Sequence, residues 1–135
     1  MVEMLSFTDL QRIASELTAH IRDKRFMVVM RILTFLKQKY APAPMGWYVV
    51  VATEAAKSGQ NKVIDYLLYE FGLEIDAFDG MIVRAAAECG QKDTVLHLAK
   101  RGADLHVLDD VVFREASDEL RAALVAFEPG YEWPQ

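Results

Sequence analysis

The first forty residues arrange apolar and polar positions with the period of two amphipathic helices. Between residues 10 and 21 the apolar side chains recur every three or four positions, at Leu10, Ile13, Ala14, Leu17 and Ile21. The preceding segment Ser6–Asp9 resembles a capping box, which marks the start of a helix. A second helix is expected from about Lys24 to Lys39, with apolar positions Val28, Val29, Ile32, Leu33 and Leu36. Pro42 and Pro44 end this pair.

An internal repeat occupies the middle of the chain. Residues 55–68 and 86–99 share one pattern at a constant offset, so that Gly59 aligns with Gly90. Each copy has a pair of alanines, then a glycine followed by glutamine, then apolar residues at helical spacing. Gly72 and Gly102 follow the two copies and stop the second helix of each. The repeating unit is therefore a helix, a tight turn, a second helix and a loop.

The glycines and alanines of this unit have separate physical roles. An alanine pair lets a short helix pack closely on its neighbour, because a methyl group is small. Gly59 and Gly90 suit the position just after a helix, where the chain turns into the left-handed region. Residues 48–51 are rich in β-branched side chains and leave one alternative open, a buried strand in an α/β domain.

The two ends of the chain fit the same architecture. Val112–Ala116 aligns with Ile82–Ala86 of the preceding unit and predicts a short helix, followed by another over Asp118–Phe127. We expect one all-α domain over residues 1–135. Its parts are an N-terminal helical cap (1–43), two repeats (44–78 and 79–109), a truncated C-terminal cap (110–127) and a tail (128–135). The outer helix pairs cap the stack, as repeat arrays require.

The segment Asp79–Asp104 resembles an ankyrin repeat across its whole length, and Arg101–His106 is similar to the Gly-Ala-Asp-Val-Asn ending of that family. The unit at 48–78 resembles it more weakly, so the resemblance covers about residues 48–110. It implies a short ankyrin-type solenoid of about four stacked helix pairs with atypical capping units. Met81–Arg84 replaces the family's Thr-Pro-Leu-His, so the usual polar network that opens the first helix is missing.

The resemblance also implies how the chain works. Ankyrin-type stacks bind other proteins on a concave face, built from the loops between helix pairs (the fingers) and the first helix of each unit. The candidate partner-binding residues are Glu74, Asp76, Phe78, Asp79, Met81, Arg84, Glu88, Asp104, His106, Leu108, Asp109 and Asp110. Glu54 and Lys57 adjoin them. The expected function is a non-catalytic protein-protein interaction module.

Charge narrows the kind of partner. The net charge is −5, but residues 1–40 carry +3 and residues 41–135 carry −8. An acidic body argues against direct nucleic-acid binding, which needs cations to neutralise phosphates. It suits a partner protein with a basic face. Asp76, Asp79, Asp104, Asp109 and Asp110 are expected to form an acidic ridge. The alternative function is a small acidic inhibitor that masks a basic, nucleic-acid-handling target.

Composition supports a folded protein in a reducing compartment. Hydrophobic residues make up 53% and charged residues 26% of the 135 residues, as in ordinary globular domains. Cys89 is the only cysteine, so no internal disulfide can form, and we expect it to be a small buried apolar residue. The sequence shows neither a secretory signal nor a membrane-spanning stretch, so a cytoplasmic protein without membrane contact is expected.

Motifs for catalysis or metal binding are missing from the sequence. His20, His97 and His106 have no ligand spacing with one another or with Cys89, so no metal and no cofactor is expected. No phosphate loop, nucleophile elbow or catalytic triad pattern occurs, which indicates a protein that is not an enzyme. His97 fits the boundary of the core. The tail after Phe127 carries Tyr131 and Trp133, which either dock on the last helices, the interpretation we favour, or form a recognition segment.

Overall fold

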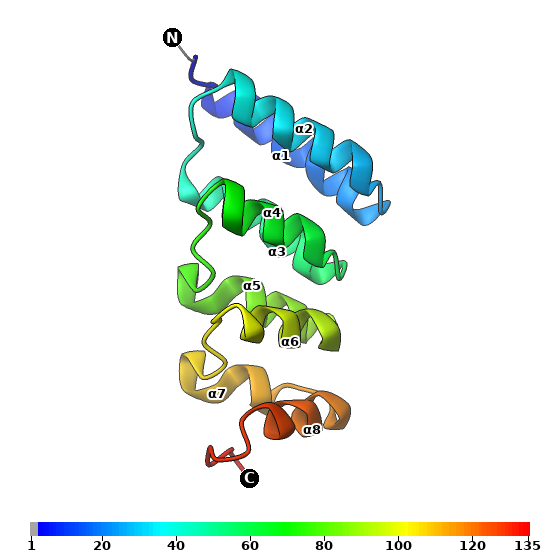
Figure 1. The fold of residues 1–135 in the computed structure, drawn as a ribbon, viewed down its shortest axis with the longest axis vertical. Helices are drawn as coiled ribbons and strands as arrows, with labels where there is room; N and C mark the ends of the chain where they lie inside the picture. Colours follow the sequence, from blue (N-terminus) through cyan, green and yellow to red (C-terminus); the bar gives the residue numbers. More distant parts are fainter. Residues whose placement is uncertain (1–2) are drawn as a thin grey trace.

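The chain folds into helices alone over the part that the computed structural model describes, residues 3–135 (Figure 1). Within that range the only β contact is an isolated bridge between Glu3 and Tyr40. The helices are α1 (Phe7–Arg22), α2 (Phe26–Lys39), α3 (Met45–Lys57), α4 (Asn61–Glu70), α5 (Ala77–Glu88), α6 (Lys92–Lys100), α7 (Val107–Arg114) and α8 (Asp118–Phe127). The prediction of an all-α protein is confirmed.

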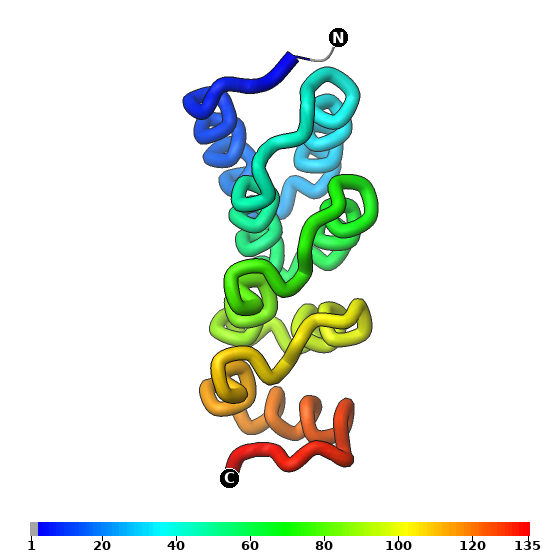
Figure 2. The backbone as a smooth tube through the Cα atoms, turned by 90° about the vertical axis from the view of Figure 1, so that its left-hand side faces the viewer, coloured from blue at the N-terminus to red at the C-terminus, as the bar shows by residue number. Residues whose placement is uncertain are grey.

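The helices form antiparallel pairs that stack in a single row from the N-terminus to the C-terminus (Figure 1). Helices α1, α3, α5 and α7 form one layer, in which each packs on the next, and α2, α4, α6 and α8 form the other. The longer loops that join successive pairs all lie on one side, which faces the viewer in Figure 2. The tight turns within the pairs lie on the opposite side. The result is a helical repeat in which each pair contacts its neighbours.

The strand alternative for residues 48–51 is wrong, because these residues lie inside α3. Helix α3 packs on α1 on one side, on α5 on the other and on its pair partner α4. Tyr48, Val49, Val51 and Ala52 are therefore all buried. A helix that is buried nearly all round shows a continuous apolar run, and such a run is difficult to tell from a strand by periodicity.

The predicted turn residues take the conformations that the pattern requires. Gly59 and Gly90 both have φ of +70°, just after α3 and α5. A Cβ atom at Gly59 would lie 2.8 Å from Oε1 of Gln91, the end of a flexible side chain that can move, so the positive φ is the main reason for glycine here. At the front of the chain, the Ser6 hydroxyl accepts a hydrogen bond from the backbone N–H of Asp9 at 3.1 Å and caps α1. The capping prediction is confirmed.

The glutamine after each glycine links one helix pair to the pair before it. Nε2 of Gln60 donates to the carbonyl of Ile21 at the end of α1. Nε2 of Gln91 donates in the same way to the carbonyl of Lys57 at the end of α3, at 2.9 Å. Each glutamine thus donates a hydrogen bond to a carbonyl in the last turn of the preceding pair's first helix, and the Ile21 carbonyl also accepts from the backbone N–H of Lys24 at 3.0 Å.

Polar contacts also join the second helices of successive pairs. The Thr94 hydroxyl donates to Oδ1 of Asn61 at 2.7 Å, and Nε2 of His97 lies 2.8 Å from Oδ1 of Asp65. Arg101 reaches the same Asp65 carboxylate at 2.6 Å. His97 is therefore a satisfied boundary histidine, as expected. Cys89 contradicts its prediction: it is exposed, because it follows the last turn of α5 at the open side of the tight turn.

No helix within residues 3–135 is both long and apolar enough to cross a bilayer.

Candidate functional site

Two left-handed turns stand at the starts of α5 and α7, in the loops that join successive pairs. The first turn comprises Phe78, Asp79 and Gly80, with φ of 53°, 54° and 70°. The second comprises Leu108, Asp109 and Asp110, with φ of 49°, 56° and 60°. They occupy equivalent positions in successive units of the repeat. A left-handed conformation costs a non-glycine residue about 1–2 kcal/mol, so other contacts must hold both turns in place.

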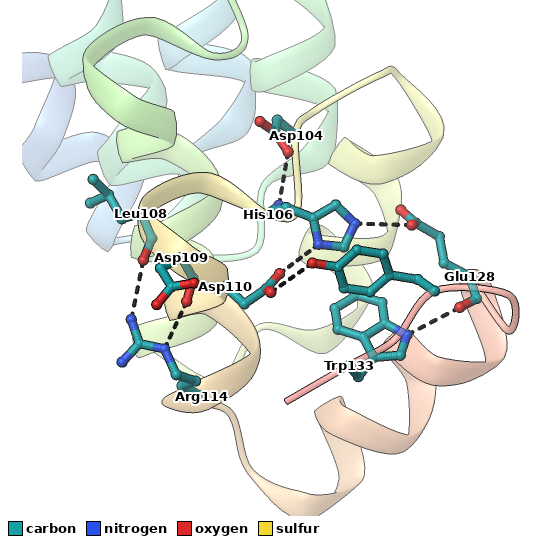
Figure 3. Close-up of polar contacts among 9 residues, drawn as sticks. Asp104, His106, Leu108, Asp109, Asp110, Arg114, Glu128 and Trp133 are labelled. Atoms are coloured by element: carbon teal, nitrogen blue, oxygen red, sulfur yellow. Dashed lines mark hydrogen bonds and ion pairs between the residues drawn. The ribbon is translucent and has the colours of Figure 1, made fainter. Parts of the chain in front are cut away.

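An arginine one turn into each helix supplies these contacts. Arg84 donates from Nε to the carbonyl of Asp79 at 2.9 Å and from a terminal nitrogen to the carbonyl of Phe78 at 3.0 Å. Arg114 makes the same pair of bonds in the second turn, at 2.8 and 3.1 Å (Figure 3). The planar guanidinium fork fits two adjacent acceptors, which an ammonium group cannot match. Each arginine thus clamps its turn.

The clamped turns hold one large apolar side chain and one carboxylate toward solvent. Phe78 is 57% exposed and Leu108 is 50% exposed. Asp79 and Asp109 are exposed, and within the described residues neither carboxylate forms a hydrogen bond or an ion pair. Met81, at 37% exposure, lies beside the first turn. We call Phe78, Asp79, Met81, Leu108 and Asp109 the turn face.

The third residue of each turn is buried, in two different ways. Gly80 lies against the next helix pair, where an added Cβ would come within 3.1 Å of both γ carbons of Val107. Asp110, at the equivalent position, is only 7% exposed and carries a carboxylate into the structure. Asp110 was expected on an acidic surface ridge, and that prediction is wrong because its side chain is enclosed by residues of the tail.

The Asp110 carboxylate belongs to a hydrogen-bonded cluster (Figure 3). Its Oδ1 lies 2.6 Å from Nδ1 of His106, and its Oδ2 accepts a bond of 2.7 Å from the Tyr131 hydroxyl. The other ring nitrogen of His106 lies 3.0 Å from a carboxylate oxygen of Glu128. Ionised carboxylates only accept hydrogen bonds, so the ring satisfies both of them when both nitrogens carry protons. The geometry fits the imidazolium form.

Electrostatics in the cluster agree with that protonation state. Burial of the His106 ring opposes its charge, but the hydrogen bonds to Asp110 and Glu128 outweigh burial and raise the pKa of His106 above 6.5. Burial likewise acts to raise the pKa of Asp110, and the bonds from His106 and Tyr131 reverse this and hold it below 3.8. The hydrogen bond to Asp110 is the main cause of the raised pKa of Tyr131.

The tail docks on the last helix pair, as favoured from the sequence. The ring of Tyr131 lies 3.8 Å from that of His106, centroid to centroid. Trp133 stacks on Phe113 at 4.9 Å and donates from Nε1 to the carbonyl of Glu128 at 3.1 Å. His106 is therefore half-buried between tail and helix, and it is not an open finger residue.

The remaining predicted site residues differ in whether their side chains are engaged in hydrogen bonds. Arg84 is half-buried and engaged in its clamp, so its role is to position the turn face. Asp76 and Asp104 are exposed, but each accepts a backbone N–H bond of 2.8 Å, from Asp104 and His106 respectively, and braces its loop. Glu74 and Glu88 are exposed at the margins. The expected acidic ridge is reduced to Asp79 and Asp109, with the two braced carboxylates beside them.

Sequence reasoning missed the role of Arg114. Its signal was present, because Arg114 occupies the position in its unit that Arg84 has in the preceding one. A second missed feature is an apolar pocket of about 300 Å³ between the first two helix pairs, lined mainly by Leu10, Leu36, Tyr40, Trp47, Tyr48 and Phe71. Among residues 3–135, no group of three His, Cys, Asp or Glu side chains is placed to hold a metal ion.

Comparisons of the chain with family models, with curated proteins and with solved structures find no match. The functional assignment therefore depends on the geometry of the two turns and on the charges around them.

Proposed function

We propose that this chain is a short ankyrin-type solenoid of the cytoplasm that binds another protein, without catalysing a reaction, through the turn face and the adjoining helices α5 and α7. One observation carries the proposal: two strained turns, at equivalent positions of successive helix pairs, are each clamped by an arginine and present the same pair of exposed groups. Strained backbone persists where the surroundings enforce it, and it concentrates at functional sites.

The ankyrin-type assignment is supported by the constant offset of the internal repeat and by the stacked pairs whose connecting loops share one side. The arginine clamps offer a reason for the missing Thr-Pro-Leu-His network. In this chain Arg84 and Arg114 give partners to the carbonyls at the start of the first helix of their unit. One arginine in each unit thus holds the start of the first helix without that network.

The chemistry of the turn face supports a partner protein with a basic and partly apolar surface. Phe78 and Leu108 are each about half exposed, so burying the rest of each side chain against a partner would contribute about 1 kcal/mol. Asp79 and Asp109 have no partner among the described residues, and the body of residues 41–135 carries −8. Unpaired surface carboxylates beside apolar anchors favour association with cations and speed the encounter.

The proposal is tested by affinity capture from cell lysate with three forms of the protein. The first is wild type, the second carries Phe78→Ser with Leu108→Ser, and the third is a matched control, Tyr69→Ser with Val125→Ser, in which exposed apolar groups of α4 and α8 are removed. Wild type and control should retain a common protein that the Phe78/Leu108 variant loses, while all three unfold at similar temperatures. Retention of the same proteins by all three forms would contradict the proposal.

The acidic inhibitor is the second candidate, and the charge of the body favours it. Asp79→Lys with Asp109→Lys would then slow association with the captured protein and leave thermal stability nearly unchanged. Competition decides between the two functions. If nucleic acid displaces this chain from the captured protein, the chain masks a nucleic-acid site; if both bind together, it acts as an interaction module.

A further inference from the structure

Helix α2 presents a second surface, apolar and basic, at the other end of the molecule. Residues 24–53 contain five Lys or Arg residues and no Asp or Glu. The outward side of α2 exposes Met27 (64%), Phe35 (51%) and Val28 (37%), whereas Val29 and Leu33 on the opposite side are completely buried. We call the exposed set the α2 stripe: Met27, Val28, Arg31, Phe35, Gln38 and Lys39.

Among residues 3–135, no carboxylate pairs with the cations of the α2 stripe. In residues 3–135, neither Arg31 nor Lys39 forms an ion pair. Nearby cations on other faces do: Arg22 pairs with Glu54 at 3.2 Å, and Lys37 pairs with Glu70. Arg31 lies one helical turn from both Met27 and Phe35, so charge and apolar area alternate along the stripe. A surface of this kind fits a binding partner that is itself apolar and acidic.

The turn face has that complementary character. It presents Phe78 with Asp79 and Leu108 with Asp109, opposite in charge to the α2 stripe. The spacings also match. Val28 and Phe35 lie about two helical turns apart, which is about 10.5 Å along the helix axis. Phe78 and Leu108 belong to successive helix pairs, and packed helices lie about 8–10 Å apart.

We infer that the turn face of one copy of this chain binds the α2 stripe of a second copy, head to tail; this rests on the proposed function of the turn face. Phe78 and Leu108 then contact Val28 and Phe35 across the interface, and Arg31 pairs with Asp79 or Asp109. The net charges of +3 for residues 1–40 and −8 for residues 41–135 favour this arrangement over contacts between like ends.

The two surfaces lie in different parts of the stack. Helix α2 belongs to the first pair, whereas the two turns begin the third and fourth pairs (Figures 1 and 2). One copy can therefore use both surfaces at once. An interface between two different surfaces leaves one of each free at the ends of an assembly, so it adds further copies unless a ring closes.

One helix face against two turns buries less area than a standard interface of about 1,600 Å², so the self-association is weak. We expect monomers at about 5 μM and concentration-dependent growth toward about 500 μM, a range that corresponds to a dissociation constant on the order of 100 μM. Raising the salt concentration from about 0.05 to 0.5 M should weaken the association, because the exposed ion pairs are screened.

Sedimentation equilibrium on wild type, two variants, their mixture and a control variant tests the inference. The stripe variant carries Met27→Ser and Phe35→Ser, and the turn variant carries Phe78→Ser and Leu108→Ser. Each alone should remain at the monomer mass of 15.3 kDa. An equimolar mixture should give a dimer that does not grow, because only one intact surface of each kind remains. The Tyr69→Ser/Val125→Ser control should associate like wild type.

Three outcomes would overturn the inference: wild type that stays monomeric up to about 500 μM, a stripe variant that associates like wild type, or a mixture that stays monomeric. Circular dichroism of each variant confirms that loss of association is not loss of folding. The lysate capture separates this inference from the proposed function. If wild type is monomeric but the turn variant still loses its captured protein, the inference of self-association is wrong and the proposed function stands.

Discussion

The two left-handed turns reach one backbone shape with different third residues. The first turn uses Gly80, whose missing side chain leaves room for Val107 of the next pair. The second uses Asp110, whose carboxylate is held by His106 and Tyr131. Both keep the arginine clamp. A strained turn can thus be stabilised by removing the clashing atom or by giving the extra atoms partners, and the second solution makes the turn depend on a distant segment.

The largest expected effect comes from Gly80→Ala. The added methyl meets Val107 at 3.1 Å and Val83 at 3.3 Å in a left-handed backbone, and we expect unfolding to be easier by about 3 kcal/mol in urea denaturation. Gly72→Ala is the matched control, with φ of +66° and nothing within 4 Å of the added atom. It should cost about 1 kcal/mol, from backbone strain alone. Equal losses of stability in the two variants would mean that close packing against Val107 is not the reason for a glycine at position 80.

The next effect comes from removing the clamps one at a time. Arg84→Met should lower the free energy of unfolding by about 2 kcal/mol and Arg114→Met by about 1 kcal/mol. The difference arises because Arg114 is exposed and its turn is also anchored through Asp110. Arg84→Lys should be little more stable than Arg84→Met, since an ammonium cannot bond both carbonyls in the fork geometry. A larger loss of stability from Arg114→Met than from Arg84→Met would show that the second turn depends more on its arginine than the first.

The second turn alone should respond to pH. A group whose pKa is raised on folding stabilises the fold fully below its unfolded pKa, and this contribution is lost as the pH rises through the folded pKa. The advantage of wild type over His106→Gln should therefore be complete below pH 6.5 and shrink as the pH rises above it. Trp133 fluorescence, read in a Trp47→Phe background, should report release of the tail over the same range. An advantage that does not change with pH would exclude the imidazolium.

The smallest net effect is expected from Asp110→Gly, which converts the second turn into a copy of the first. Glycine relieves about 1 kcal/mol of left-handed strain, and loss of the bonds to His106 and Tyr131 offsets that gain. We expect a net loss of about 1 kcal/mol at acidic pH and a smaller loss once the pH has risen through the raised pKa of His106 and the ring is uncharged. Equal losses across the pH range would show that the Asp110 carboxylate stabilises the turn independently of the histidine.

Local patterns predicted most of the architecture. The glycine and glutamine of each unit, the Ser6 cap and the helices over residues 10–21 and 118–127 follow from short-range rules, and the structure has them. The left-handed turns did not follow, because Phe78–Asp79 and Leu108–Asp109 carry no glycine that would signal φ above zero. Their stabilising contact comes from an arginine in the next turn of the helix, which no periodicity test detects.

Local sequence rules also do not predict the burial of Asp110. Two adjacent aspartates look like surface charge, and Tyr131, which bonds the carboxylate of the second one, lies beyond the whole of α8 in an irregular segment. The same reasoning failed for Cys89, where a single residue at the end of a helix can face the core or solvent. Patterns predict faces of helices well, and they predict contacts between an irregular tail and a loop poorly.

The glutamine links have a consequence for how such a chain lengthens during evolution. The side-chain amides of Gln60 and Gln91 each bond to the helix end of the preceding unit, so in a duplicated copy of residues 61–91, inserted in tandem, the new glutamine would find the acceptor it needs. The last helix pair cannot be extended in the same way. Its turn is joined to the tail through His106 and Asp110, and a unit appended after it would displace the tail and remove the Tyr131 bond from that carboxylate. The contacts therefore favour growth by duplication in the interior of the array over growth at this end.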